Sequence, residues 1–361
     1  MEQASASGLT CEARLNLRHL PHYIDRISDR LQSFEADATQ DGQRLDFRFA
    51  FGGASFDMER LVMRAHAADR DGLARIKDLL ATAVEVYAKD ENPEIVWTGD
   101  LAGETRLAQF REMVVTDVRD LTPHMRRIRL AGEDLARFAK FGGMHIRMLF
   151  PTRQVPDPLW PVLGGNGLPV WPSEDRRPVA RVYTIRRLDV DKGIVDVDFL
   201  IHPGDSVGSA WAAQAAPGMK VGIMGPVGRP VRQASWYLMG ADETGLPALA
   251  RLLENLPAET KGVAFVEIAD DGERQEIDNA TSIELHWLTR DGVPAGTDER
   301  LACAVQSVAW PQDNSAFGWF AAEATAAKFV REHWRGTLGL GRDETLAAAY
   351  WRRGAAGLMA G

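Results

Sequence analysis

Residues 180–188 read Ala-Arg-Val-Tyr-Thr-Ile-Arg-Arg-Leu and predict a β-strand, and the interpretation of the whole chain starts from this stretch. In Arg181-Val182-Tyr183-Thr184, the arginine and the tyrosine fall on one face because successive strand side chains alternate. A guanidinium can pair with a diphosphate while the aromatic ring beside it lies on a flat heterocycle. Thr184 adds a hydroxyl or a backbone N–H next to that ring. Taken alone, these residues are explained more simply as a surface arginine and an edge tyrosine.

A second stretch, residues 202–211, predicts a strand end, a turn and the start of a helix. Asp205 or Ser206 can cap that helix, whose first backbone N–H groups point to where a phosphate would bind. His202 taken alone is explained as a hydrogen-bonded core histidine, but two such stretches at this separation are less easily accidental. Together they predict an FAD-binding pocket with these contacts: Arg181, Val182, Tyr183, Thr184, His202, Gly204, Gly208, Ser209 and Trp211.

The chain as a whole is acidic, with 361 residues, a formal net charge of -9 and a pI near 5.5. A nucleic-acid-binding domain usually carries a clustered basic surface, and no run of five or more basic residues occurs here. The charge pattern therefore excludes nucleic acid as a partner. The hydrophobic fraction of 45% is ordinary for a globular protein, and the length allows about two or three domains.

Two cysteines, Cys11 and Cys303, are too few for a disulfide framework or for an iron–sulfur cluster. The first eight residues lack the apolar core of a signal peptide, and no stretch approaches the roughly 18 apolar residues of a membrane helix. We therefore predict a soluble, cytoplasmic protein without a membrane partner. The oligomeric state is left open.

Hydrophobic patterning divides the chain into three predicted domains. Residues 1–100 combine helical and alternating spacings, as expected for an α+β domain, and its role is unknown. Residues 104–232 contain six predicted strands and one short helix, which favours an antiparallel six-stranded β-barrel. In residues 233–361 strands and helices alternate, which predicts an α/β domain with a mostly parallel sheet.

A long proline-rich loop, residues 151–178, interrupts the predicted barrel. Connections of this length without secondary structure are uncommon and are often functional. Trp160 and Trp171 make the loop either a lid over the flavin or substrate, or a packed anchor.

These motifs resemble those of the siderophore-interacting proteins, a branch of the ferredoxin-reductase-like flavoproteins. The resemblance spans residues 181–354 and is carried, in order, by Arg181-Val-Tyr183-Thr184, by His202 through Ser209 with Trp211, by Pro217-Gly218 leading to Gly225-Pro226, by residues 240–248, and by Ala349-Tyr350-Trp351-Arg352-Arg353-Gly354. It implies a flavin-binding barrel followed by an NAD(P)H-binding domain. The N-terminal part resembles an uncharacterised domain sometimes fused ahead of such reductases, which implies no function.

The resemblance also implies an activity, that of an FAD-dependent ferric-siderophore reductase. Electrons pass from NAD(P)H through the flavin to chelated Fe(III), and the iron is released because siderophores hold ferrous iron far more weakly. Since the cofactor performs the chemistry, no catalytic acid or base and no protein ligand to a metal is predicted.

The nicotinamide half has no G-x-G-x-x-G, but a predicted strand opens at Asp242-Glu243-Thr244 onto a helix. We predict that these three residues and Trp351 contact the cofactors, although an ordinary helix cap also explains Asp242. Acidic residues at the end of the next strand suit the ribose hydroxyls of NADH, whereas a nearby arginine suits a 2′-phosphate, so the donor stays open: Glu267, Asp270, Asp271 and Arg274.

Ferric siderophores are often anionic, so a basic rim beside the flavin is expected. Arg352 and Arg353 are the predicted substrate-binding residues, with Arg290 and Lys261 as weaker candidates; a solvated charge pair explains the first two equally well. Two other functions stay open. A general NAD(P)H flavin or quinone reductase differs only in its acceptor. A non-catalytic siderophore-binding protein is suggested by the unusual alanines in the segments 240–245 and 321–324.

Overall fold

The computed structural model describes residues 8–141, 143–202, 204, 206–228, 231–312 and 315–355. They belong to two compact units: Met1–Phe110 with Pro158–Arg177, and Arg111–Asp157 with Pro178–Gly361. Most of the proline-rich loop thus belongs to the first unit, although its flanking strands belong to the second. The three-domain boundaries expected from the sequence stay a prediction. No helix among these residues has the length and apolar character needed to cross a membrane.

The first unit is an antiparallel sheet with two helices on one face, which agrees with the α+β pattern read from residues 1–100. The sheet order is β2-β3-β4-β5-β1-β6. The elements are β1 (Leu9–Leu15), α1 (Leu20–Gln32), β2 (Asp37–Asp41), β3 (Arg44–Phe49), β4 (Gly52–Asp57), β5 (Val62–Ala67), α2 (Arg70–Tyr87), the 3₁₀ turn η1 (Lys89–Glu91) and β6 (Ile95–Gly99).

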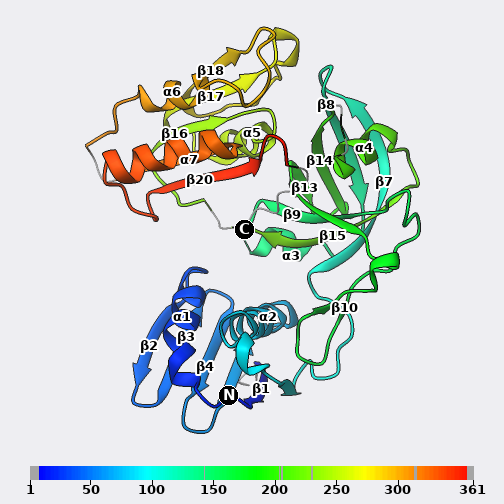
Figure 1. Ribbon diagram of the computed structural model, residues 1–361, viewed down its shortest axis with the longest axis vertical. Coiled ribbons are helices and arrows are strands. Elements are labelled where there is room, and N and C mark those ends of the chain that lie inside the picture. The colour runs from blue at the N-terminus through cyan, green and yellow to red at the C-terminus, as the bar shows by residue number, and fades with distance from the viewer. Residues whose placement is uncertain are drawn as a thin grey trace, which may run out of the picture. The chain divides into compact units, whose positions relative to one another are not determined.

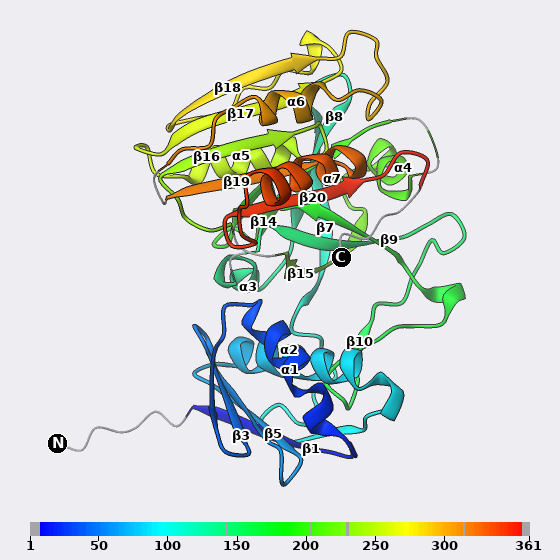
Figure 2. The same ribbon diagram turned by 60° about the vertical axis from the view of Figure 1, so that its left-hand side comes forward.

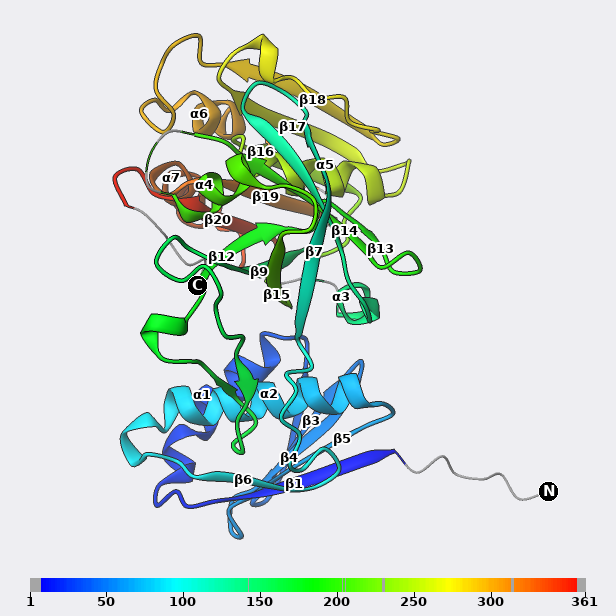
Figure 3. The same ribbon diagram turned by 90° about the vertical axis from the view of Figure 1, so that its right-hand side faces the viewer.

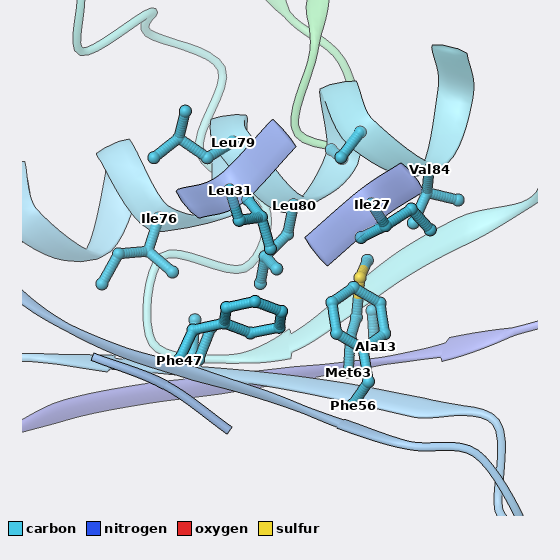
Figure 4. Packing of buried hydrophobic residues seen from close by; sticks show 14 of the residues in the cluster. Ala13, Ile27, Leu31, Phe47, Phe56, Met63, Ile76, Leu79, Leu80 and Val84 are labelled. Carbon is cyan, nitrogen blue, oxygen red and sulfur yellow. The ribbon is translucent and has the colours of Figure 1, made fainter. Parts of the chain in front are cut away.

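The core of this unit lies between the helices and the sheet. Phe47 and Phe56 point from the sheet toward Leu31 of α1 and Leu80 of α2 (Figure 4), and all four are at most 3% exposed. Alternate residues of each strand face the other side and are mostly polar, as strand periodicity requires. The two helices lie side by side over the sheet (Figure 2).

The first unit also holds the inserted loop. The loop forms a small hairpin of β10 (Val162–Leu163) and β11 (Pro169–Val170), followed by the turn η2 (Glu174–Arg176), and the hairpin lies beside α2 (Figures 1 and 3). The buried Trp97 indole donates to the carbonyl of Asn166 at 2.9 Å.

Glycine is required at the tip of this hairpin. Gly167 has φ +86, and a Cβ there would come within 2.8 Å of the Trp97 indole nitrogen. Trp160 packs on Phe110 with ring centroids 5.5 Å apart, while Trp171 stacks under the Arg177 guanidinium. Of the two interpretations of the loop, these contacts support the packed anchor.

The second unit begins with an antiparallel sheet in the order β12-β9-β15-β7-β8-β14-β13. Its elements are β7 (Phe110–Asp120), β8 (Met125–Ala131), α3 (Ala136–Lys140), β9 (His145–Phe150), β12 (Val179–Thr184), β13 (Arg187–Asp189), β14 (Ile194–Leu200), α4 (Val207–Gln214) and β15 (Lys220–Val227). Only Ile185 and Arg186 separate β12 from β13, so the two end strands lie within about 11 Å of each other at the break. The sheet therefore curls into a barrel.

The sheet has seven strands, whereas six were predicted. The difference arises because the expected strand 180–188 is broken into two, β12 and β13. At the break, the Arg186 N–H donates to Asp196 of β14 rather than continuing along β9. Its guanidinium is buried and pairs with Glu254 at 2.5 Å. A buried ion pair depends on a residue far away in the chain, and local patterning does not reveal it.

The rest of the second unit is a five-stranded parallel sheet in the order β18-β17-β16-β19-β20, which agrees with the mostly parallel sheet expected from the sequence. Its elements are β16 (Trp236–Ala241), α5 (Leu246–Asn255), β17 (Lys261–Ile268), η3 (Asp271–Glu273), β18 (Ser282–Thr289), α6 (Arg300–Gln306), β19 (Ala316–Glu323), α7 (Ala324–Glu332), the short π-helix η4 (His333–Thr337) and β20 (Thr345–Trp351). Helix α5 covers one face, and α6 and α7 cover the other (Figure 2). Because all strands are parallel, their carboxyl ends form one edge, where such sheets bind ligands.

Candidate functional site

The strand β12 places the predicted flavin residues on two faces of the barrel wall. Tyr183 lies opposite the buried Ile146 of β9, and its ring packs 4.4 Å from Phe199 between centroids. Burial raises the pKa of the Tyr183 phenol, so the hydroxyl stays neutral. Val182 and Thr184 face the other way, where Val182 is half-buried and Thr184 is buried. Tyr183 is thus held by core aromatics, and its contact with a heterocycle stays a prediction.

Arg181 is half-buried and makes no ion pair with the residues that the structure describes. Its Nη1 donates to the carbonyl of Ala180 at 2.7 Å, which leaves the rest of the guanidinium for a ligand. A second arginine, Arg147 of β9, was missed by the sequence reasoning. Its Nε is buried and has no hydrogen-bond partner, and its register partner is Val182, on the outer face. The signal for it was an arginine inside an otherwise apolar strand.

The helix α4 packs its amino end against Tyr183. A Cβ on Gly208 would lie 1.8 Å from the Tyr183 hydroxyl, so only glycine fits there. Ser206 at the N-cap makes no side-chain hydrogen bond to the helix, so the first-turn N–H groups are not capped by it. Asp205, the other predicted cap, lies outside the described residues.

The remaining residues of this stretch brace the turn or the barrel core. The Ser209 hydroxyl accepts from the His202 N–H at 3.0 Å and donates to the His202 carbonyl. Trp211 is 7% exposed and packs 5.2 Å from Phe150 between centroids. Gly204 has φ +115 and open space around it. Direct cofactor contacts by these four residues stay predictions.

The arrangement fits a flat cofactor that carries a diphosphate. The helix end lacks a side-chain cap from Ser206, and helix amino ends bind phosphate. Arg181, next to Val182 in β12, and Arg147, the register partner of Val182 in β9, supply positive charge on opposite faces of this strand pair. A bound anion would also give the buried Nε of Arg147 a partner.

In the parallel sheet, Asp242 holds the turn that follows β16. Its Oδ1 accepts from the Thr244 N–H at 2.9 Å, and its Oδ2 accepts from the Trp351 indole at 2.6 Å. Burial raises the pKa of Asp242, against hydrogen bonds from Thr244 and Trp351 that lower it. Asp242 therefore holds the turn before α5 and ties the end of β20 to the end of β16, and its contact with a cofactor stays a prediction.

The carboxyl ends of β17 and β18 carry a buried charge cluster. The Arg290 guanidinium is bidentate to Glu243 at 2.5 and 2.9 Å and donates to Glu267 at 3.2 Å. All three residues are at most 7% exposed. Burial raises the pKa of Glu267 to about 7, although Arg290 lowers it.

The two weaker candidates for the basic rim, Arg290 and Lys261, do not lie where a basic rim needs them. Arg290 is buried and neutralised, so it does not contribute a free charge to a substrate surface. Lys261 begins β17 and therefore lies at the amino edge of the sheet, opposite the ligand edge. Sequence position alone reveals neither pairing nor burial.

The raised pKa of Glu267 predicts a pH-dependent stability. The folded protein retains a proton on this group between about pH 4.5 and 7 that the unfolded chain releases, so stability falls as pH rises through that window. We expect Glu267→Gln to remove this loss, which is about 1–3 kcal/mol. Denaturant unfolding at pH 5 and pH 8 measures it, with the exposed Glu259→Gln as control. Equal pH dependence of wild type and Glu267→Gln would contradict the assignment.

The barrel and the parallel sheet meet at His145 of β9 and Tyr350 of β20. The His145 Nε2 and the Tyr350 hydroxyl are 2.6 Å apart. Burial, with the nearby charge of Arg251, lowers the pKa of His145 to about 4, so the imidazole is neutral. His145 lies opposite Thr184 in the register, which brings the predicted flavin strand next to the end of β20. This contact brings two predicted cofactor residues, Thr184 of β12 and Trp351 at the end of β20, into the same region.

Beyond Trp351, the chain exposes two positive side chains. Arg352 and Arg353 are exposed, and neither makes a side-chain ion pair with the part of the chain that the structure describes. The Arg353 N–H donates to the buried Glu323 at 3.2 Å, which fixes the backbone of this segment. Their position at the carboxyl end of β20 is the ligand edge, as a basic rim requires.

A curled antiparallel barrel followed by a parallel α/β sheet is the arrangement of a ferredoxin-reductase-like flavoprotein. Residues 114–230 match the family model of the siderophore-interacting FAD-binding domain, and residues 234–354 match that of siderophore-interacting protein. The chain belongs to the siderophore-interacting protein family.

Relatives of known name match about two thirds of the chain. Ferric vibriobactin reductase ViuB of Vibrio cholerae serotype O1 is 30% identical over 238 residues, 65% of this chain and 86% of that protein. The NADPH-dependent ferric-chelate reductase of Escherichia coli K12 is 32% identical over 251 residues, 67% and 93% respectively. The crystal structure of a siderophore utilization protein from T. fusca shows 33% identity with a TM-score of 0.58, covering 70% of this chain and 96% of that one.

Proposed function

We propose that this protein is an FAD-dependent ferric-siderophore reductase that takes electrons from NAD(P)H. The observation that carries the proposal is the hydrogen bond between His145 and Tyr350, because it joins the flavin side of the barrel to the ligand edge of the parallel sheet. The names of the two reductase relatives support the same activity.

The residues have separate tasks in this proposal. Arg181, on the same face of β12 as Tyr183, and the amino end of α4 would hold the diphosphate. Arg147 would add positive charge from the other face, where Thr184 would lie beside the flavin ring. A bound flavin would supply this site with hydride acceptance and one-electron transfer. Tyr350 and His145 are both neutral and hold the end of β20 against β9, so neither of these two side chains carries a charge that opposes the approach of the donor.

The substrate we propose is an anionic ferric siderophore or ferric chelate, bound at the rim formed by Arg352 and Arg353. Iron reaches the protein inside its chelate and needs no ligand from the chain. Reduction then weakens the chelate, and the ferrous iron leaves. The N-terminal unit holds the inserted loop and is given no part in the chemistry.

An anaerobic titration tests this function. The purified protein is expected to bind FAD, to bleach in the visible flavin band with NADH or NADPH, and to recover its colour on addition of a ferric siderophore. Bleaching followed by oxidation with quinones but not with ferric chelates identifies a general reductase. Bound flavin that neither nucleotide bleaches identifies a non-catalytic siderophore-binding protein.

Removing the exposed charges is expected to weaken substrate binding. The double variant Arg352→Ala/Arg353→Ala should raise the KM for an anionic ferric siderophore about 5- to 20-fold with little change in kcat, because screened surface charges act on encounter and binding. Steady-state kinetics between 20 and 500 mM salt, as a rough range, measures it. Lys261→Ala, at the opposite edge of the sheet, is the matched control. A KM that keeps its full salt dependence in the double variant excludes this rim.

A further inference from the structure

Three arginines follow the carboxyl ends of β17 and β18, up to the first residue of α6. Each of them is paired with a carboxylate. The Nε of Arg274 is 2.6 Å from Asp271, the Nη2 of Arg290 is 2.5 Å from Glu243, and the Nε of Arg300 is 2.7 Å from Asp298. Lysine is absent between residues 262 and 300. Each arginine in this segment therefore already has a carboxylate partner, and no lysine is present to bind another anion.

The acidic side chains at the same edge outnumber these arginines. They are Glu243, Asp270, Asp271, Asp291 and Asp298, with Glu267 added above its raised pKa of about 7. Some are engaged in turns, where Asp270 accepts from the Gly272 N–H and Asp291 accepts from the Thr289 hydroxyl. Hydrogen bonds to neutral groups do not cancel charge, so this edge is electronegative.

The position of this edge matters because of how dinucleotides lie on such sheets. The adenine ribose is recognised near the end of the strand next to the first one, where an acidic residue suits a ribose 2′-hydroxyl and an arginine suits a 2′-phosphate. In this chain β16 is the first strand, β17 is its neighbour, and β17 ends beside Glu267. The 2′-phosphate of NADPH would bring a charge of about −1.5 to −2 to this place.

We infer that this edge makes NADH the preferred hydride donor over NADPH. Arg290 cannot turn to a phosphate without leaving the buried Glu243 and Glu267 unpaired. Arg274 is more adaptable, because it is 48% exposed and its partner Asp271 is 76% exposed. The inference rests on the proposed nucleotide site and adds the identity of the donor.

The test separates binding from reduction. Calorimetric titration of the FAD-loaded protein with NAD⁺ and NADP⁺, which transfer no hydride, gives the ratio of the two dissociation constants. We expect NADP⁺ to bind at least tenfold more weakly than NAD⁺ at low salt, and the ratio to shrink as salt screens the edge. Equal or tighter binding of NADP⁺, or failure to bind NAD⁺, would overturn the inference.

A single substitution sharpens the test. Asp271→Asn releases Arg274, so the ratio of dissociation constants for NADP⁺ and NAD⁺ should fall at least threefold. Glu259→Gln removes one exposed charge near the amino end of β17 and should leave the ratio unchanged. A ratio that moves equally in both variants assigns the effect to net charge and contradicts a local edge. If NAD⁺ is preferred but neither NADH nor NADPH bleaches the flavin, the inference stands and the proposed reductase function fails.

Discussion

Gly208→Ala is expected to lower the affinity for FAD by at least tenfold and to destabilise the fold by about 1–3 kcal/mol. A Cβ at this position lies 1.8 Å from the Tyr183 hydroxyl and 2.8 Å from its Cζ. The Tyr183 ring cannot withdraw inward because it packs against Phe199 and Phe150. The amino end of α4 must therefore move away from β12, and the proposed diphosphate site opens. Fluorescence titration of the apoprotein with FAD measures the affinity.

Two further variants separate this steric effect from a general loss of stability. Adding Tyr183→Phe to Gly208→Ala removes the clashing oxygen and should restore much of the FAD affinity. Ala210→Gly, exposed on the same helix, costs about 1 kcal/mol of helix propensity without a clash and should leave the FAD affinity near wild type. If Ala210→Gly weakens FAD binding as much as Gly208→Ala, the contact with Tyr183 does not control the site.

The pair formed by Gly208 and Tyr183 also shows how far the sequence could lead. The order of motifs indicated that the two stretches belong together, and hydrophobic alternation predicted the strand that carries Tyr183 and the helix that carries Gly208. What alternation could not show is which face of β12 looks inward, since both faces carry polar as well as apolar side chains. The register with β9 decides this, and it places Tyr183 opposite Ile146.

The features that the sequence did not reveal all depend on contacts between distant residues. The break between β12 and β13 depends on Glu254, which lies 68 residues from Arg186. The inserted loop is anchored by Trp97, 69 residues before Asn166. Local composition describes the first as one long strand and the second as an unstructured loop, because the deciding partner lies outside any sequence window.

Arg290→Met is expected to cost about 3–5 kcal/mol of unfolding free energy at pH 8, the largest stability effect of any single charge considered for this chain. The Arg290 guanidinium is the counter-charge of both Glu243 and Glu267, and all three side chains are buried. Methionine leaves the two carboxylates facing each other without compensation. The loss should be smaller at pH 5, where protonation removes the repulsion between them. Denaturant unfolding at both pH values measures it.

The matched control is Arg274→Met, which removes an arginine with an equally short ion pair, 2.6 Å to Asp271, in an exposed position. It should cost no more than about 1 kcal/mol, since solvent replaces the lost partner. The triple variant Arg290→Met/Glu243→Gln/Glu267→Gln should recover most of the lost stability, because two neutral amides do not repel each other and need no counter-charge. If Arg290→Met costs no more than Arg274→Met, or if the triple variant remains as unstable as the single one, the cluster does not depend on charge compensation by Arg290.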